Sequence, residues 1–136
     1  KVQMMKSLLI VTAVIETATG IALVLAPPLV VSVLLGASLD TSAAVALGRV
    51  AGAALLSWGI ACWFARHDGQ SRAATGLVTA MLLYNIAVVA VLTFAGLGSG
   101  LIGIALWPAV VLHTALAVWC IACLRITGVN MSGGAS

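Results

Sequence analysis

Strongly polar side chains stand in the middle of long apolar stretches at four places in this chain: Glu16, Arg49, Asn85 and His113. At about 1.5 Å of rise per residue, helices through these stretches would hold all four groups within a slab of about 8 Å. An ionisable group inside a membrane helix is costly, and it nearly always faces the protein interior with a partner. We therefore expect these four residues to converge in one buried polar network, with Tyr84 at its edge.

An ion pair between Glu16 and Arg49 is the most specific of these expectations. The chain has three acidic residues, and Glu16 is the one that lies deep in an apolar run. Beside Arg49 its carboxylate should be ionised, whereas alone in lipid it would hold its proton. Two interpretations stay open. In the first, the pair is a structural link between the helices, and replacing one of the two residues by alanine should harm folding more than replacing both. In the second, the pair is a site for a ligand, a proton or an ion.

The imidazole of His113 has several possible roles: ligand to a metal or haem, proton relay, or hydrogen-bond partner of Asn85 or Tyr84. Haem with two axial histidines would need a second histidine in the membrane, and His67 instead lies in a polar turn. No nucleophile and base stand together where water could reach them. The sequence therefore indicates no catalytic residues and no metal site, leaves any cofactor unknown, and favours a protein that is not an enzyme.

Three cysteines, Cys62, Cys120 and Cys123, all lie inside apolar stretches. The spacing Cys120-x-x-Cys123 suggests redox chemistry, but thiols three residues apart within a helix rarely meet the geometry of a disulfide. We favour the interpretation that they are small side chains tolerated in an apolar environment.

Composition decides the class of protein. Of 136 residues, 63% are hydrophobic and only 7% are charged, whereas soluble domains carry roughly a quarter charged residues. Such a chain cannot cover a surface that faces water, so a lipid bilayer must be its solvent. The net charge of +3 does not indicate a nucleic-acid partner, because the basic residues flank apolar segments rather than cluster.

Four apolar segments are long enough to cross a bilayer, and they predict an all-α, four-helix transmembrane bundle with helices at about 7–26, 42–65, 72–95 and 101–124. Pro27 and Pro28 end the first helix, which at about 20 residues is too long for the apolar region of a signal peptide. The short segment 29–35 that follows reads as interfacial or re-entrant. We expect one domain over residues 1–127 and a flexible tail over 128–136.

Glycine marks the expected packing face of the second long helix. One stripe at helical spacing holds Arg49, Gly52, Leu56, Gly59 and Trp63. Gly48 and Gly52 form a G-x-x-x-G step, which lets a neighbouring helix approach closely. The facing stripe of the first helix would hold Thr12, Glu16, Thr19 and Gly20.

Basic residues predict the orientation in the membrane. They occur near the N-terminus, between the second and third long helices, and at the end of the fourth: Lys1, Lys6, Arg66, Arg72 and Arg125. By the positive-inside rule, both termini are expected to face the cytoplasm, with the protein in a bacterial inner (plasma) membrane.

The first half of the chain resembles a known family. A polar residue in the first helix, a proline-ended helix, the apolar connection from Pro28 to Gly36, and R-x-x-G at Arg49 and Gly52 are similar to small bacterial four-helix proteins of the DoxX-like kind. Some of those proteins are tied to redox or quinone-linked complexes. This resemblance assigns no role to any residue here.

Small multidrug resistance transporters offer a second comparison, because they too have four helices and one membrane-embedded glutamate in the first. Glu16 is similar in place. Those transporters keep their glutamate without an arginine neighbour so that it can exchange protons for cations, so Arg49 argues against this likeness. The aromatic G-x-G motif of their third helix is also missing here.

Two functions follow from the sequence. The first is a non-enzymatic accessory subunit or oligomeric scaffold of a membrane assembly, because the chain has near-absent loops and glycine-rich faces. The alternative is a carrier or binder of a small lipophilic or protonatable ligand, such as a quinone-like molecule, a proton or a cation, at the polar network. A cavity beside that network would favour the alternative, and a solidly packed centre would exclude it.

Overall fold

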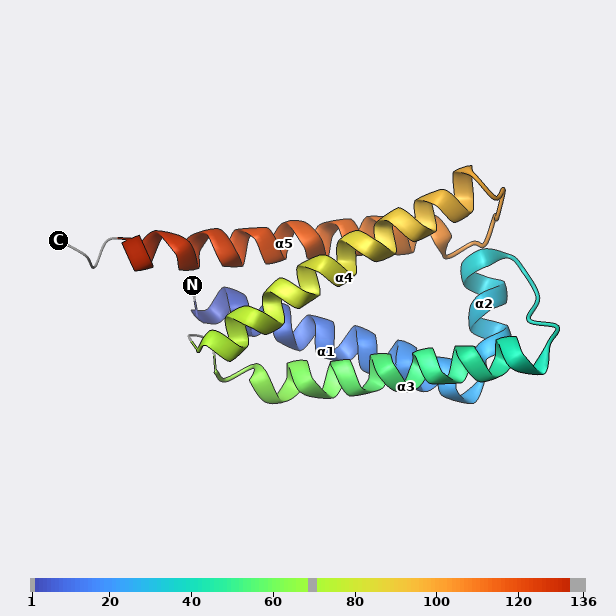
Figure 1. Cartoon of the computed structure of the whole chain (residues 1–136), viewed down its shortest axis with the longest axis horizontal. Coiled ribbons are helices and arrows are strands. Elements are labelled where there is room, and N and C mark those ends of the chain that lie inside the picture. Colours follow the sequence, from blue (N-terminus) through green and yellow to red (C-terminus); the bar gives the residue numbers. More distant parts are fainter. Residues whose placement is uncertain (1, 69–70, 133–136) are drawn as a thin grey trace.

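The computed structural model describes residues 2–68 and 71–132, with side chains as far as residue 126. Within these ranges the chain forms α1 (Val2–Leu25), α2 (Pro27–Leu35), α3 (Ser42–Ala65), α4 (Arg72–Leu97) and α5 (Leu106–Ser132) (Figure 1). All of these helices except α2 are long and apolar enough to cross a membrane. The prediction of an all-α protein with four long apolar helices and a short segment between the first two is confirmed.

Local sequence signals explain where α3 and α4 begin. The hydroxyl of Thr41 accepts a hydrogen bond from the Ala44 amide at 3.1 Å, and the hydroxyl of Ser71 does the same for the Ala74 amide at 3.0 Å. Each satisfies one of the amides that the first turn of a helix leaves without a partner. Thr41 is thus the N-cap of α3, and Ser71 is the N-cap of α4.

The fourth long helix begins later than we expected, at Leu106 instead of residue 101. Pro108 explains the shift, because a proline lacks an amide hydrogen and is tolerated best in the first turn of a helix. At the other end, α5 continues to Ser132. The segment that we expected to be a flexible tail from residue 128 is therefore helical as far as Ser132, and residues 133–136 lie outside the described residues.

The long helices form two antiparallel pairs, α1 with α3 and α4 with α5 (Figure 1). Backbones approach closely within the first pair because glycines line its contact. A β-carbon on Gly20 would lie 2.5 Å from the Leu56 amide nitrogen, and one on Gly52 would lie 2.8 Å from the Gly20 carbonyl oxygen. The two pairs contact each other less than the helices within each pair do.

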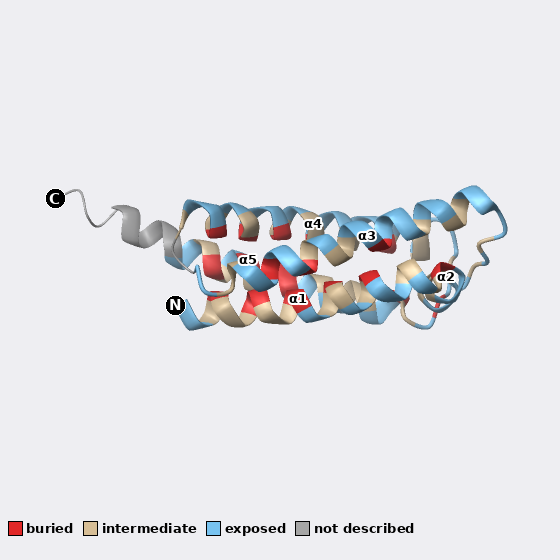
Figure 2. Ribbon diagram, turned by 90° about the horizontal axis from the view of Figure 1, so that it is seen from below, coloured by how far each residue is buried: buried red, intermediate tan, exposed pale blue. Residues whose placement is uncertain are grey.

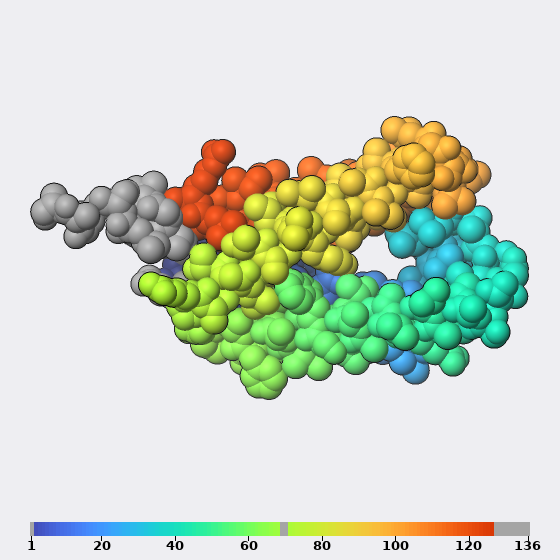
Figure 3. Space-filling view, viewed as in Figure 1, coloured from blue at the N-terminus to red at the C-terminus, as the bar shows by residue number. Residues whose placement is uncertain are grey.

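The buried core lies in the half of the bundle that holds the start of α1 and the end of α3 (Figure 2). Its members come from the start of α1, the end of α3, the start of α4 and the second half of α5: Met5, Leu8, Leu9, Ala13, Cys62, Ala74, Val78, Met81, Leu116, Cys120 and Cys123. In the opposite half the two pairs separate, and the space-filling view shows a hollow between them (Figure 3).

Helix α2 closes that opposite end by bridging the two pairs. The amide of Ala105, just before α5, donates a hydrogen bond to the Val33 carbonyl at 3.0 Å. Gly103 packs directly against the backbone of Leu34, where a β-carbon would overlap the carbonyl group. Gly36 ends α2 in the left-handed conformation, at φ 68°, which glycine adopts without strain.

Candidate functional site

Glu16 lies at the inner edge of the packed core, and its side chain is only 2% exposed. The hydroxyl of Tyr84 on α4 donates a hydrogen bond to its Oε2 at 3.4 Å. One turn earlier on α1, the Thr12 hydroxyl is also buried, and it has no hydrogen-bond partner among the described residues. These contacts place the carboxyl group between the two helix pairs.

Asn85 links α4 to α5 next to this carboxyl group. Its amide nitrogen donates to the Met81 carbonyl at 2.7 Å, and its amide oxygen lies 2.7 Å from Nδ1 of His113. The rings of Tyr84 and His113 meet edge to face, with centroids 5.8 Å apart. The structure thus brings Glu16, Tyr84, Asn85 and His113 together, and we call these four residues the polar cluster.

Arg49 is not part of the polar cluster. Its side chain is exposed, and it has no ion pair within the part of the chain that the structure describes. The predicted ion pair between Arg49 and Glu16 is therefore wrong. Arg49 gives no reason to expect the carboxyl group of Glu16 to be ionised. The reason is geometric. Gly59 of α3 faces Thr17, the neighbour of Glu16, whereas Arg49 lies next to Gly48, which faces Pro27. Arg49 is thus ten residues, or about 15 Å, along α3 from the level of Glu16.

We expect the substitutions Glu16→Gln and Arg49→Gln to change the free energy of unfolding independently. Sites without shared contacts usually couple by less than about 0.5 kcal/mol. Unfolding of the four proteins of a double-mutant cycle in mixed micelles of mild and denaturing detergent measures the coupling. A coupling of about 3 kcal/mol, typical of a buried ion pair losing one partner, would show that the two side chains do meet.

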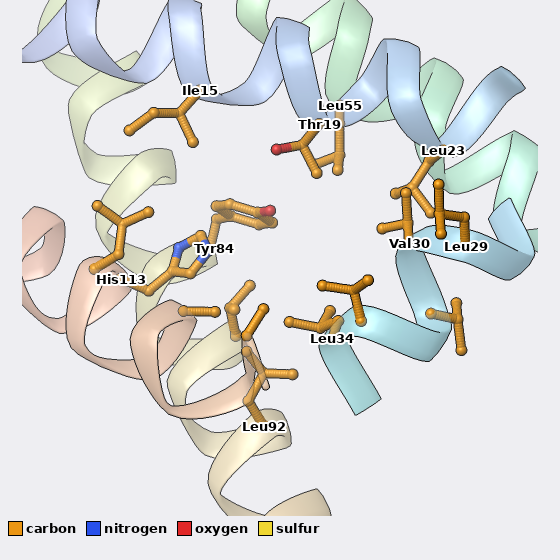
Figure 4. Close-up of a pocket in the computed structure, with 16 residues that line it drawn as sticks. Ile15, Thr19, Leu23, Leu29, Val30, Leu34, Leu55, Tyr84, Leu92 and His113 are labelled. Atoms are coloured by element: carbon orange, nitrogen blue, oxygen red, sulfur yellow. The ribbon is translucent and has the colours of Figure 1, made fainter. Parts of the chain in front are cut away.

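An apolar cavity of about 540 Å³ begins at the polar cluster and extends between the helix pairs toward α2. Tyr84 and His113 form part of its wall, and Thr19 points into it from α1 (Figure 4). The remaining side chains of the wall are aliphatic, among them Ile15, Leu23, Leu29, Val30, Leu34, Leu55, Val88, Leu92, Ala109 and Leu112. The packed half of the bundle therefore ends in polar groups, and the open half is lined by hydrocarbon.

Sequence reasoning missed the contribution of α2 to this wall. The sequence predicts a short apolar segment at residues 29–35, but not that its side chains line one end of a cavity. The available signal is weak: apart from Ser32, every residue of α2 is apolar, so its pattern does not separate a face toward lipid from a face toward the protein.

Fold and site together define a polytopic membrane protein with four spans, in which a buried polar cluster opens into an apolar cavity. No family model, curated protein or solved structure matches this chain. The resemblance to DoxX-like proteins is supported only as far as the four candidate spans. Among the residues that the structure describes, no three histidine, cysteine or acidic side chains gather in a way that could hold a metal ion.

Proposed function

We propose that this protein binds a small lipophilic ligand in the cavity between its two helix pairs. The observation that carries the proposal is the cavity itself, about 540 Å³ in volume and bounded at one end by Tyr84 and His113. Small-molecule sites typically have volumes of about 300–1,000 Å³, apolar walls and a few polar groups that orient the ligand. This cavity has all three properties.

The state of the polar cluster supports the same function. A cluster that served only to hold helices together would be enclosed by packed side chains. Here two members of the cluster, Tyr84 and His113, form part of the cavity wall, where a ligand could contact them. Binding free energy would come from burying the apolar body of the ligand, and the polar groups would orient it.

Analysis of what copurifies with the protein tests this proposal. Protein purified in mild detergent is extracted with organic solvent, and the extract is analysed by mass spectrometry. Ala109→Phe places a ring in the cavity, and Ala115→Phe makes the same change at an exposed position of α5. We expect a lipophilic compound with the native protein and the Ala115→Phe variant, and its loss with Ala109→Phe. Equal extracts from all three proteins would refute the proposal.

A second candidate function is the accessory subunit or oligomeric scaffold, which a groove on the outer side of the first helix pair favours. This groove has a volume of about 610 Å³ and lies between α1 and α3, with Ala13 and Ala18 among its small residues and Trp63 and Phe64 among its large ones. Small residues allow a membrane helix to pack closely. Sizing in mild detergent tests the idea, and a strictly monomeric particle without partners would count against it.

We also propose that the protein lies in a bacterial inner membrane with both termini in the cytoplasm. The start of α1 and the end of α5 lie at the same end of the bundle (Figure 1), and Lys6, Arg66, Arg72 and Arg125 lie in the segments toward that end. In a variant that lacks the native cysteines, Ser99→Cys should react with an impermeant maleimide added outside intact spheroplasts. Reaction only after the membrane is permeabilised would reverse the orientation.

A further inference from the structure

We propose that the ligand of the cavity carries a hydrogen-bond donor as its head group, namely the hydroxyl of a lipophilic alcohol or phenol. This inference rests on the proposed function and specifies the chemical class of the ligand. It follows from which atoms of the polar cluster already have a hydrogen-bond partner and which are left for a ligand.

The amide of Asn85 determines which nitrogen of His113 carries the hydrogen. Its nitrogen donates to the Met81 carbonyl, which can only accept, so its oxygen is the atom that faces Nδ1 of His113. An amide oxygen only accepts as well. Nδ1 must therefore be the protonated nitrogen, and in a neutral imidazole the other nitrogen, Nε2, is then a bare acceptor.

The neutral form of His113 is the one that fits this environment. A charged imidazolium in an apolar cavity needs an ionised partner. The acidic residue of the polar cluster, Glu16, is hydrogen-bonded to Tyr84, and within the described residues His113 is hydrogen-bonded to Asn85 alone. Its Nε2 has no hydrogen bond to any described residue. Because the side chain forms part of the cavity wall, Nε2 is the acceptor that a ligand would meet.

Tyr84 reinforces the same preference. A phenolic hydroxyl has one hydrogen, and that of Tyr84 is directed to Oε2 of Glu16. The oxygen keeps its capacity to accept, so toward a ligand it offers a second acceptor. Thr19, the remaining hydroxyl of the wall, can rotate to donate or to accept. The polar end of the cavity therefore presents mostly acceptors, which a ligand with only carbonyl or ether oxygens could not satisfy.

A ligand bound in this way has a defined orientation. Its hydroxyl would lie between His113 and Tyr84, and its apolar body would extend along the aliphatic wall toward Leu34 of α2 (Figure 4). A short alkyl chain would suit this part of the cavity because the wall there is aliphatic.

Binding of 4-heptylphenol and of 4-heptylanisole, its methyl ether, tests the inference. The two probes share the same tail and ring, but the ether has no hydrogen to donate. Calorimetric titration of the detergent-solubilised protein gives their affinities, expressed as mole fraction in the micelle so that partitioning is removed. We expect the phenol to bind about tenfold more tightly, the effect of one hydrogen bond in an apolar site. His113→Phe, which keeps a ring but removes the acceptor, should reduce this ratio toward one.

The outcomes separate the inference from the function on which it rests. The two probes could bind with equal affinity, or the ether could bind more tightly, with Ala109→Phe abolishing the binding of both. That result would overturn the proposal of a donor head group, but it would leave a lipophilic site in the cavity. Failure of both probes to bind native protein would overturn the site as well. The Ala115→Phe variant, altered outside the cavity, must retain the affinities of the native protein, and sizing of each variant establishes that it is folded.

Discussion

Gly52→Ala is expected to destabilise the protein strongly, although it adds a single methyl group. A β-carbon at this position would lie 2.8 Å from three atoms of α1: the Gly20 carbonyl oxygen, Cβ of Leu23 and the Val24 amide nitrogen. Two of these are backbone atoms, which cannot rotate away, so α1 and α3 would have to separate. Overpacking of this kind costs about 1–3 kcal/mol in a well-packed interior.

Gly76→Ala is the matched control for this prediction. It makes the same change in another membrane-spanning helix, but a β-carbon there would have no atom within 4 Å among the described residues. Alanine is the better helix former by about 1 kcal/mol, so this variant should be as stable as the native protein or more stable. Unfolding in mixed detergent micelles measures both. Similar effects at the two positions would show that α1 and α3 do not pack through Gly52.

Gly103→Ala is expected to detach α2 from the connection between α4 and α5. A β-carbon here would overlap the carbonyl group of Leu34 and would lie 2.5 Å from the Leu35 amide nitrogen. The contact is between two backbones, so the change cannot be absorbed by a side chain. The neighbouring hydrogen bond from Ala105 to Val33 should break with it. We expect the cavity to open at this end and the affinity for 4-heptylphenol to fall about tenfold or more.

Hydrogen exchange of the backbone amides measures this detachment. Protection of the Ala105 amide should fall by at least about tenfold, while the core half of α1 stays protected. Gly100→Ala is the control, because Gly100 has φ 67° and a β-carbon there meets no described atom. It should cost only the local strain of a left-handed alanine, about 1–2 kcal/mol, and should leave the affinity unchanged. A loss of affinity in both variants would mean that the connection, and not its contact with α2, supports the cavity.

The class of protein and the number of its spans could be predicted from the sequence because they depend on composition and on local signals. A chain with 7% charged residues cannot face water, and apolar runs longer than about 18 residues can span a bilayer. The first long helix does end before Pro27 and Pro28, as their lack of an amide hydrogen predicts. These outcomes depend on neighbours within a few residues, so they need no knowledge of the rest of the fold.

Only the tertiary structure decided which polar residues meet. Counting residues along each predicted helix gives the depth of a side chain in the membrane. This count predicts similar depths for Glu16 and Arg49. Whether they touch depends on how the two helices are aligned along their length, and the tight glycine contact between α1 and α3 sets that alignment. In that contact Gly59 faces Thr17, so Glu16 lies at the level of Gly59, about 15 Å along α3 from Arg49. The cavity has the same origin, because its walls come from helices far apart in the chain and its volume is what remains after those helices have packed.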